Sequence, residues 1–229
     1  MKHNIFGIIL ACFGSMAFAN EIYIQQVGDT LDLSISQTGA GNKIGNATTA
    51  AAFTGDNMTF AITQTGDSNV IDAVINGNSY TGTWNFTGNS NTVDLLCSSL
   101  GTTQCENVTV DIAVNGSSND FTVYIGENKI ADNLVVDFTV DGDGNVIVAN
   151  LDATNADVTV TIDSSLSGAG GNTFTIDQDD AGSTNGHSIT YDHTGGNGNI
   201  SITQSGILDQ TVNVVSSGDD HNVTITQTD

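Results

Sequence analysis

Apolar and polar residues alternate along most of the chain, in short runs separated by turns that contain Gly and Asn. In residues 108–114 and 134–140 every second side chain is aliphatic or aromatic, and mostly Thr, Asp or Ala stand between them. Side chains two residues apart in a strand share one face, so the alternation predicts strands with one buried and one exposed face. The predicted buried residues are Val108, Val110, Ile112, Val114, Leu134, Val136, Phe138 and Val140, and the predicted exposed residues are Thr109, Asp111, Asp137 and Thr139.

Turns of the form Gly-x-x-Asn recur at a spacing of about 22 to 28 residues, and a period in this range indicates a repeat architecture. Both residue types tolerate the left-handed backbone of a tight turn, which is the role we expect for them. Residues 169–172 and 219–222 are variants of the same turn. The predicted turn residues are Gly39, Asn42, Gly66, Asn69, Gly88, Asn91, Gly116, Asn119, Gly142, Asn145, Gly196 and Asn199.

Two strands lie between successive turns, which is the pattern of a flattened coil. A single coil of this kind cannot bury its apolar face, but a stack of coils can. We therefore expect one all-β domain, a β-solenoid of about eight strand–turn–strand coils, roughly 40 Å tall at the usual strand spacing. The pattern gives no register for residues 43–56, where residues 46–52 form the poorest strand.

Several strands end in a glutamine that faces the same way as the two apolar residues before it. Burying an amide costs a few kcal/mol unless it is hydrogen-bonded. In a stack of similar strands each amide can bond to the ones above and below, so this cost is recovered. The glutamines predicted to form an inward ladder are Gln26, Gln37, Gln64, Gln178, Gln204 and Gln227.

The N-terminus has the pattern of a secretory signal peptide. Lys2 precedes an apolar run that ends Ala17-Phe18-Ala19, so we expect residues 1–19 to be removed and residues 20–229 to form the repeat domain. Cys12 fits a lipoprotein cleavage site less well, because Leu10 suits that motif poorly and the cysteine comes early. The formal net charge of -23 disfavours nucleic acid and anionic membranes as partners.

The segments Gln37-x-Gly39-x-x-Asn42 and Gln64-x-Gly66-x-x-Asn69 resemble the middle of the curlin repeat, Ser-x5-Gln-x-Gly-x2-Asn-x-Ala-x3-Gln. Residues 77–171 keep only the period of that repeat. Leu31 and Met58 stand where the family has Ser, and Ile44 and Ile71 where it has Ala. The resemblance implies a secreted β-solenoid subunit that polymerises into curli, the amyloid fibres of the biofilm matrix. It also implies a curli-type nucleator and an outer-membrane export pore as partners.

Cys97 and Cys105 flank residues 98–104, between two strands of an exported chain. We expect a disulfide that closes this loop, and two free thiols in a reducing niche are the alternative. The segment Asp141-Gly142-Asp143-Gly144-Asn145 has oxygen ligands of the kind found in calcium loops. Val146 stands where an EF-hand needs Gly, so a plain turn explains the segment better. No nucleophile, base or pocket stands out, so we expect neither an enzyme nor a cofactor.

The mature chain begins with Ile22, Ile24 and Gln26 on one face and closes with Val223, Ile225 and Gln227 on one face. Solenoids that stay monomeric usually carry polar caps, so these uncapped strands favour end-to-end stacking. Two other functions stay open. One is a monomeric adhesin or viral fibre protein, and the other is an ice-binding solenoid, because Thr-x-Thr pairs recur on the outer face.

Overall fold

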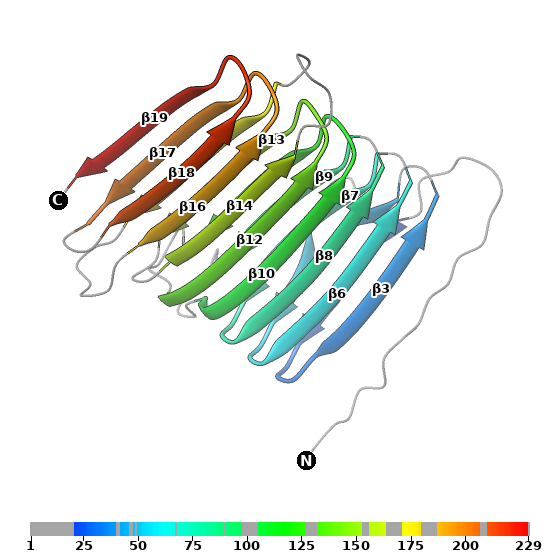
Figure 1. The fold of residues 1–229 in the computed structure, drawn as a ribbon. Coiled ribbons are helices and arrows are strands. Elements are labelled where there is room, and N and C mark those ends of the chain that lie inside the picture. The colour runs from blue at the N-terminus through cyan, green and yellow to red at the C-terminus, as the bar shows by residue number, and fades with distance from the viewer. Residues whose placement is uncertain are drawn as a thin grey trace.

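The computed structural model describes residues 21–39, 42–45, 48, 50–66, 68–88, 90–97, 105–126, 132–152, 156–163, 171–179, 187–206 and 210–228. These residues form two parallel β-sheets that lie face to face, with the first and the last described strands at opposite ends of the stack (Figure 1). Sheet 1 contains β1 (Glu21–Ile22), β2 (Gln25–Val27), β4 (Lys43–Ile44), β5 (Ala51–Thr54), β7 (Val70–Asn76), β9 (Thr92–Cys97), β11 (Asp120–Ile125), β13 (Val146–Asp152), β15 (Thr173–Asp179), β17 (Asn199–Ser205) and β19 (Asn222–Thr228). Sheet 2 contains β3 (Asp32–Thr38), β6 (Met58–Thr65), β8 (Tyr80–Thr87), β10 (Glu106–Asn115), β12 (Asp132–Asp141), β14 (Ala156–Asp163), β16 (Ser188–Thr194) and β18 (Thr211–Ser217).

The chain passes from one sheet to the other and back, and each strand pairs in parallel with the strand one coil further on. This connectivity is a parallel β-solenoid, the fold expected from the period of the turns. Sheet 2 has eight strands in the described part of the chain, which agrees with the expected number of coils. No helix occurs among the described residues, and so none that is long and apolar enough to cross a membrane.

The core lies between the two sheets and is built from the inward side chains of both. All eight residues predicted to be buried in β10 and β12 are buried, so the register inferred from the alternation is confirmed. Asp111 and Thr139 are exposed as expected, while Thr109 and Asp137 are half-buried. Aromatic rings bridge the sheets within this core, as in the contact of Phe53 with Phe60 at 4.3 Å between ring centroids.

The structure supplies the register that the sequence pattern left open for residues 43–56. Here one rung of sheet 1 is divided between β4 and β5, and both strands pair with β7. Ile44 lies beside Ile71, and Ala51 lies beside Ala73. Six residues separate Ile44 from Ala51 in the sequence, whereas one residue separates their partners Ile71 and Ala73, which explains why no continuous alternation is visible there. Residues 1–19 and 98–104 lie outside the described part of the chain.

Candidate functional site

Turn glycines form a column along one edge of the solenoid. Gly39, Gly66, Gly88, Gly116 and Gly142 all have φ between 123° and 159°, a backbone conformation that favours glycine. A Cβ atom on Gly142 would also collide with the backbone carbonyl oxygen of Gly116 in the coil below. At the turn of Gly142 the two coils therefore approach more closely than any larger residue would permit.

The predicted turn asparagines have a different role from the one expected. Asn42, Asn69, Asn91, Asn119 and Asn145 are buried, and none has a positive φ. The left-handed position is the preceding residue, as at Ser68, Ser90 and Ser118. The left-handed backbone expected of these asparagines is therefore wrong, and their role is a buried one.

The buried asparagines form a hydrogen-bonded ladder in the later coils. The backbone N–H and Nδ2 of Asn119 donate to Oδ1 of Asn145 at 3.1 and 2.9 Å. Asn91 donates in the same way to Asn119, and Asn145 donates to Asn172. The Nδ2 of Asn91 and of Asn145 also donates to the carbonyl of the turn glycine three residues earlier. One amide thus joins a coil to its neighbour and closes its own turn.

The turn predicted at Gly196 and Asn199 lies one residue earlier. Asn199 pairs with Thr173 inside the sheet and is exposed, so Gly198 stands in the ladder column beside Asn172. Gly195, with φ 134°, is the turn glycine of this coil. Gly195 and Gly196 are adjacent in the sequence, and the Gly-x-x-Asn pattern selects the wrong one of these two. His221 occupies the same column in the last coil, because Asn222 pairs with Asn199.

Two histidines fill the space that Gly198 leaves in the ladder column. The rings of His193 and His221 lie 4.7 Å apart between centroids, edge to face. A Cβ atom on Gly198 would lie 2.6 Å from Cε1 of His193, so only glycine leaves room for this pair. Burial lowers the pKa of His193, the neighbouring His221 lowers it further, and Asp192 partly opposes both effects.

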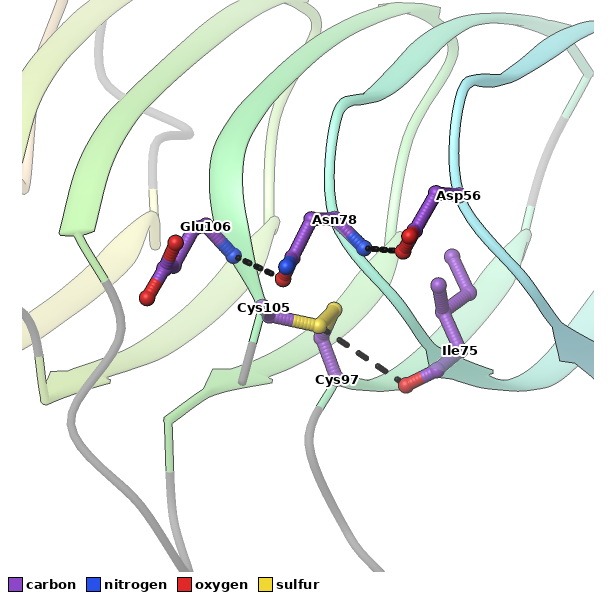
Figure 2. Close-up of a disulfide and its surroundings, with 6 residues drawn as sticks. All are labelled: Asp56, Ile75, Asn78, Cys97, Cys105 and Glu106. Atoms are coloured by element: carbon purple, nitrogen blue, oxygen red, sulfur yellow. Dashed lines mark hydrogen bonds between the residues drawn. A yellow bond between two sulfur atoms is a disulfide. The ribbon is translucent and has the colours of Figure 1, made fainter. Parts of the chain in front are cut away.

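A second ladder runs along the opposite edge, where the chain passes from sheet 1 to sheet 2. Asp29, Asp56 and Asn78 each accept, on a side-chain oxygen, the backbone N–H of the matching residue in the next coil, at 3.0, 2.8 and 3.2 Å. The last of these donors is Glu106 (Figure 2). Gly55 and Gly77, which precede Asp56 and Asn78, both have a positive φ. Each lies against the backbone of the equivalent glycine one coil earlier. A recurring Gly followed by Asp or Asn was the signal for this ladder in the sequence.

Cys97 and Cys105 are joined by a disulfide with a Cα–Cα distance of 6.0 Å. Both residues are buried, and they connect the end of β9 to the start of β10 beside the second ladder (Figure 2). The Sγ of Cys105 also lies 3.8 Å from the carbonyl oxygen of Ile75, one coil below. The bond therefore closes the loop at a point where coils already contact each other.

The predicted glutamines form two separate ladders, one near each end of the solenoid. In sheet 2, Nε2 of Gln64 donates to Oε1 of Gln37, and the column continues with Phe86. In sheet 1, Nε2 of Gln204 donates to Oε1 of Gln178 at 2.8 Å, and Nε2 of Gln227 donates to Oε1 of Gln204 at 2.9 Å. Gln26 is half-buried in sheet 1 at the opposite end.

The last coil leaves its inward face uncovered by the described residues. Val223 and Ile225 of β19 are 39% and 45% exposed, whereas Ile200 and Ile202, beside them in β17, are 2% and 0% exposed. β19 pairs with β17 on one side, and no described strand pairs with its other edge. An apolar face and a row of backbone donors and acceptors are thus presented together at this end.

The two ends of sheet 1 have matching residues in the same columns. Ile22 begins the column that ends at Val223, and Gln26 begins the column that ends at Gln227. Strand pairing carries the second column through Gln26, Phe53, Ile75, Cys97, Ile125, Leu151, Gln178, Gln204 and Gln227. Ile24 adjoins Gln25, which pairs with Ala52, and so begins the column that ends at Ile225. The register is therefore preserved from one end of the stack to the other.

The remaining sequence features form no site in the described residues. No group of three or more His, Cys, Asp or Glu side chains there is placed to hold a metal ion. The segment of Asp141 to Asn145 belongs to the glycine turn, closed by Asn145. On the outer face of sheet 2, Asp111 lies beside Asp137, which interrupts the columns of threonine that an ice-binding surface would need.

Comparison of the chain with protein families, with characterised proteins and with solved structures finds no match.

Proposed function

We propose that the chain is a secreted structural subunit that polymerises end to end into extracellular fibres of the curli type, for adhesion and for a biofilm matrix. The observation that carries the proposal is the match between the two ends of sheet 1. The apolar-x-apolar-x-Gln face of β19 recurs, column for column, in Ile22, Ile24 and Gln26.

Stacking in this register would continue each column of sheet 1. Val223 and Ile225 would be covered by Ile22 and Ile24 of the next copy, which removes the exposed apolar face of the last rung from water. Each glutamine of the ladder donates to the coil before it, so Oε1 of Gln227 is the acceptor for Gln26 of the next copy. Parallel strands stacked in register are the arrangement of amyloid-type fibres.

The resemblance to curlin supports the same function at the level of the repeat. Gln37, Gly39 and Asn42 match the middle of its motif, and in this chain they provide a ladder amide, a turn glycine and a buried asparagine. On this proposal a curli-type nucleator and an export pore are the partners. The alternative of a monomeric adhesin or viral fibre protein uses the same solenoid without the junction.

The proposal is tested by Ile225→Lys, with Thr226→Lys as the matched control on the outer face of the same strand. The lysine at position 225 would be buried at the junction, where an unpaired charge costs several kcal/mol. We expect Ile225→Lys to give a folded monomer that forms no fibres, because this side chain is 45% exposed in the monomer. Thr226→Lys should polymerise like the wild type, because its charge stays in water.

Thioflavin fluorescence and electron microscopy report on fibres, and circular dichroism reports on the fold of the monomer. If Ile225→Lys polymerises at the rate of the control, β19 is not part of the junction and the proposal fails.

A further inference from the structure

The two sheets of the solenoid have different numbers of levels. β1 and β2 share one level of sheet 1, and β4 and β5 share the next, so its eleven strands make nine levels in the described part of the chain. Sheet 2 has eight strands and eight levels. The difference matters where two molecules stack.

Stacking on sheet 1 sets the axial repeat of a fibre. When Gln26 of one copy follows Gln227 of another at one strand spacing, the repeat is nine spacings, about 43 Å. Sheet 2 fills eight of these nine levels. β18 of one copy and β3 of the next then lie two spacings apart, about 9.6 Å. Paired strands lie one spacing apart, so this gap has room for one additional strand.

We propose that each junction of the fibre contains a slot in sheet 2, between β18 and the next copy's β3, which binds one extended segment of a partner polypeptide. The inference rests on the proposed end-to-end assembly. The segment pairs its backbone with two edges, because each of these strands has one edge without a partner among the described strands. Strand addition to an open sheet edge is an established mode of peptide binding.

The flanking strands define the chemistry of the segment. Both are seven residues long, so the slot takes about seven residues. Val212 and Val214 line one side, with inward side chains that are half-buried, and Leu33 and Ile35 line the other. The inward residues of the segment are therefore apolar at two alternating positions. The third inward residue of the segment lies between Ser216 and Gln37. A side chain with a hydroxyl or an amide group therefore suits this position.

A repeat of eight spacings would close the gap in sheet 2, but it is disfavoured by sheet 1. One level of sheet 1 would then have to leave the stack at every junction. With β1 and β2 displaced, Gln227 would lie over Phe53 instead of Gln26. Its amide would lose the ladder partner that Gln26 supplies, and an amide buried without a partner is costly.

Helical reconstruction of wild-type fibres measures the repeat directly. We expect about 43 Å per subunit, nine strand spacings. A repeat of about 38 Å, eight spacings, would overturn the slot and the pairing of Gln227 with Gln26, while the fibres themselves would still support a polymerising subunit. If the chain forms no fibres at all, the proposed function itself fails.

The second arm uses a labelled synthetic peptide with the sequence of β3, residues 32–38, added during assembly and to preformed fibres. The matched control peptide carries lysine in place of Leu33 and Ile35. We expect the β3 peptide to speed assembly and to enter fibres at about one per subunit along their length, and the control peptide to do neither. Uptake at fibre ends alone, or equal uptake of both peptides, would show that the junctions contain no slot.

Discussion

At the scale of single residues, the ladder amides and the turn glycines specify which coil follows which. A side chain that hydrogen-bonds to the matching position one coil away penalises any slip of register, most strongly where the polar group is buried. The asparagine ladder does this at one edge, and Asp29, Asp56 and Asn78 do it at the other. The apolar columns between the edges are far less selective, because Val, Ile, Leu and Phe substitute for one another along them.

We predict that Asn119→Ala lowers the free energy of unfolding by about 2–3 kcal/mol, since it leaves buried donors of Asn91 without their acceptor. Asn115→Ala is the matched control, because this asparagine is exposed at the end of β10 and should change stability by less than about 0.5 kcal/mol. Chemical denaturation followed by circular dichroism measures both variants. Equal effects of the two substitutions would mean that the ladder contributes little.

His193 makes the C-terminal coils sensitive to acid. Its folded-state pKa is lowered, so the unfolded chain binds the proton more readily, and stability is full above about pH 6.5 and falls as the pH drops toward the folded pKa. We predict that His193→Gln reduces this loss, and that Asp192→Asn increases it because Asp192 holds the pKa up. Denaturation midpoints of each variant against wild type, between pH 7.5 and 5, test this. Parallel curves for wild type and His193→Gln would exclude His193 as the cause.

At the scale of elements, strand faces were predictable and the ends of strands were not. The alternation in β10 and β12 identified every inward residue, because one buried face imposes a period of two. The same reasoning could not distinguish Gly195 from Gly196, since both fit a turn and only pairing with β15 decides between them. It also misassigned Asn119 and its equivalents, because local propensity says nothing about a partner 26 residues away.

The two glutamine ladders show the same limit. The sequence predicted that the glutamines face inward, and four of them are buried: Gln37, Gln64, Gln178 and Gln204. It did not reveal that one group lies in sheet 2 and the other in sheet 1, because the motif is identical in both. The assignment depends on how many strands intervene, and the divided rung of β4 and β5 obscures that count.

The disulfide belongs to this scale because it fixes the passage from β9 to β10. We predict that thiol labelling of denatured, unreduced protein gives no signal from Cys97 or Cys105. Replacing both with Ser should cost about 2–3 kcal/mol in the chain-entropy description of a short loop. Two labelled thiols per secreted chain would contradict the bond, and an unchanged denaturation midpoint in the double Ser variant would contradict its contribution.

At the scale of the whole molecule, the proposed assembly has to work against charge. The formal net charge of -23 repels a second copy, and carboxylates such as Asp72 and Asp94 adjoin on neighbouring rungs of the outer face. Burial and this mutual repulsion raise the pKa of Asp72. The end faces, in contrast, present Ile22, Val223 and Ile225, which carry no charge. Contact between ends is therefore the approach that brings apolar surface together while the acidic outer faces stay in water.

In the proposed fibre the C-terminal face of one copy contacts the N-terminal face of the next. These two unlike faces allow a test that a single variant cannot give. Ile225→Lys spoils the C-terminal face and keeps the N-terminal one, whereas Ile24→Lys does the reverse. Alone, neither variant should associate. Mixed in equal amounts, the intact C-terminal face of Ile24→Lys can join the intact N-terminal face of Ile225→Lys, and the outer faces of that pair are both blocked.

We therefore predict that the mixture forms dimers and stops. Head-to-tail contacts between unlike faces normally extend without closing, but both free faces of this dimer carry the lysine. Analytical ultracentrifugation measures the species, with a mixture of Thr226→Lys and wild type as the control that continues to fibres. Fibres in the test mixture would mean that the faces are not specific. Monomers alone would mean that Ile24 and Ile225 do not meet across the junction, even though they occupy one column of the solenoid.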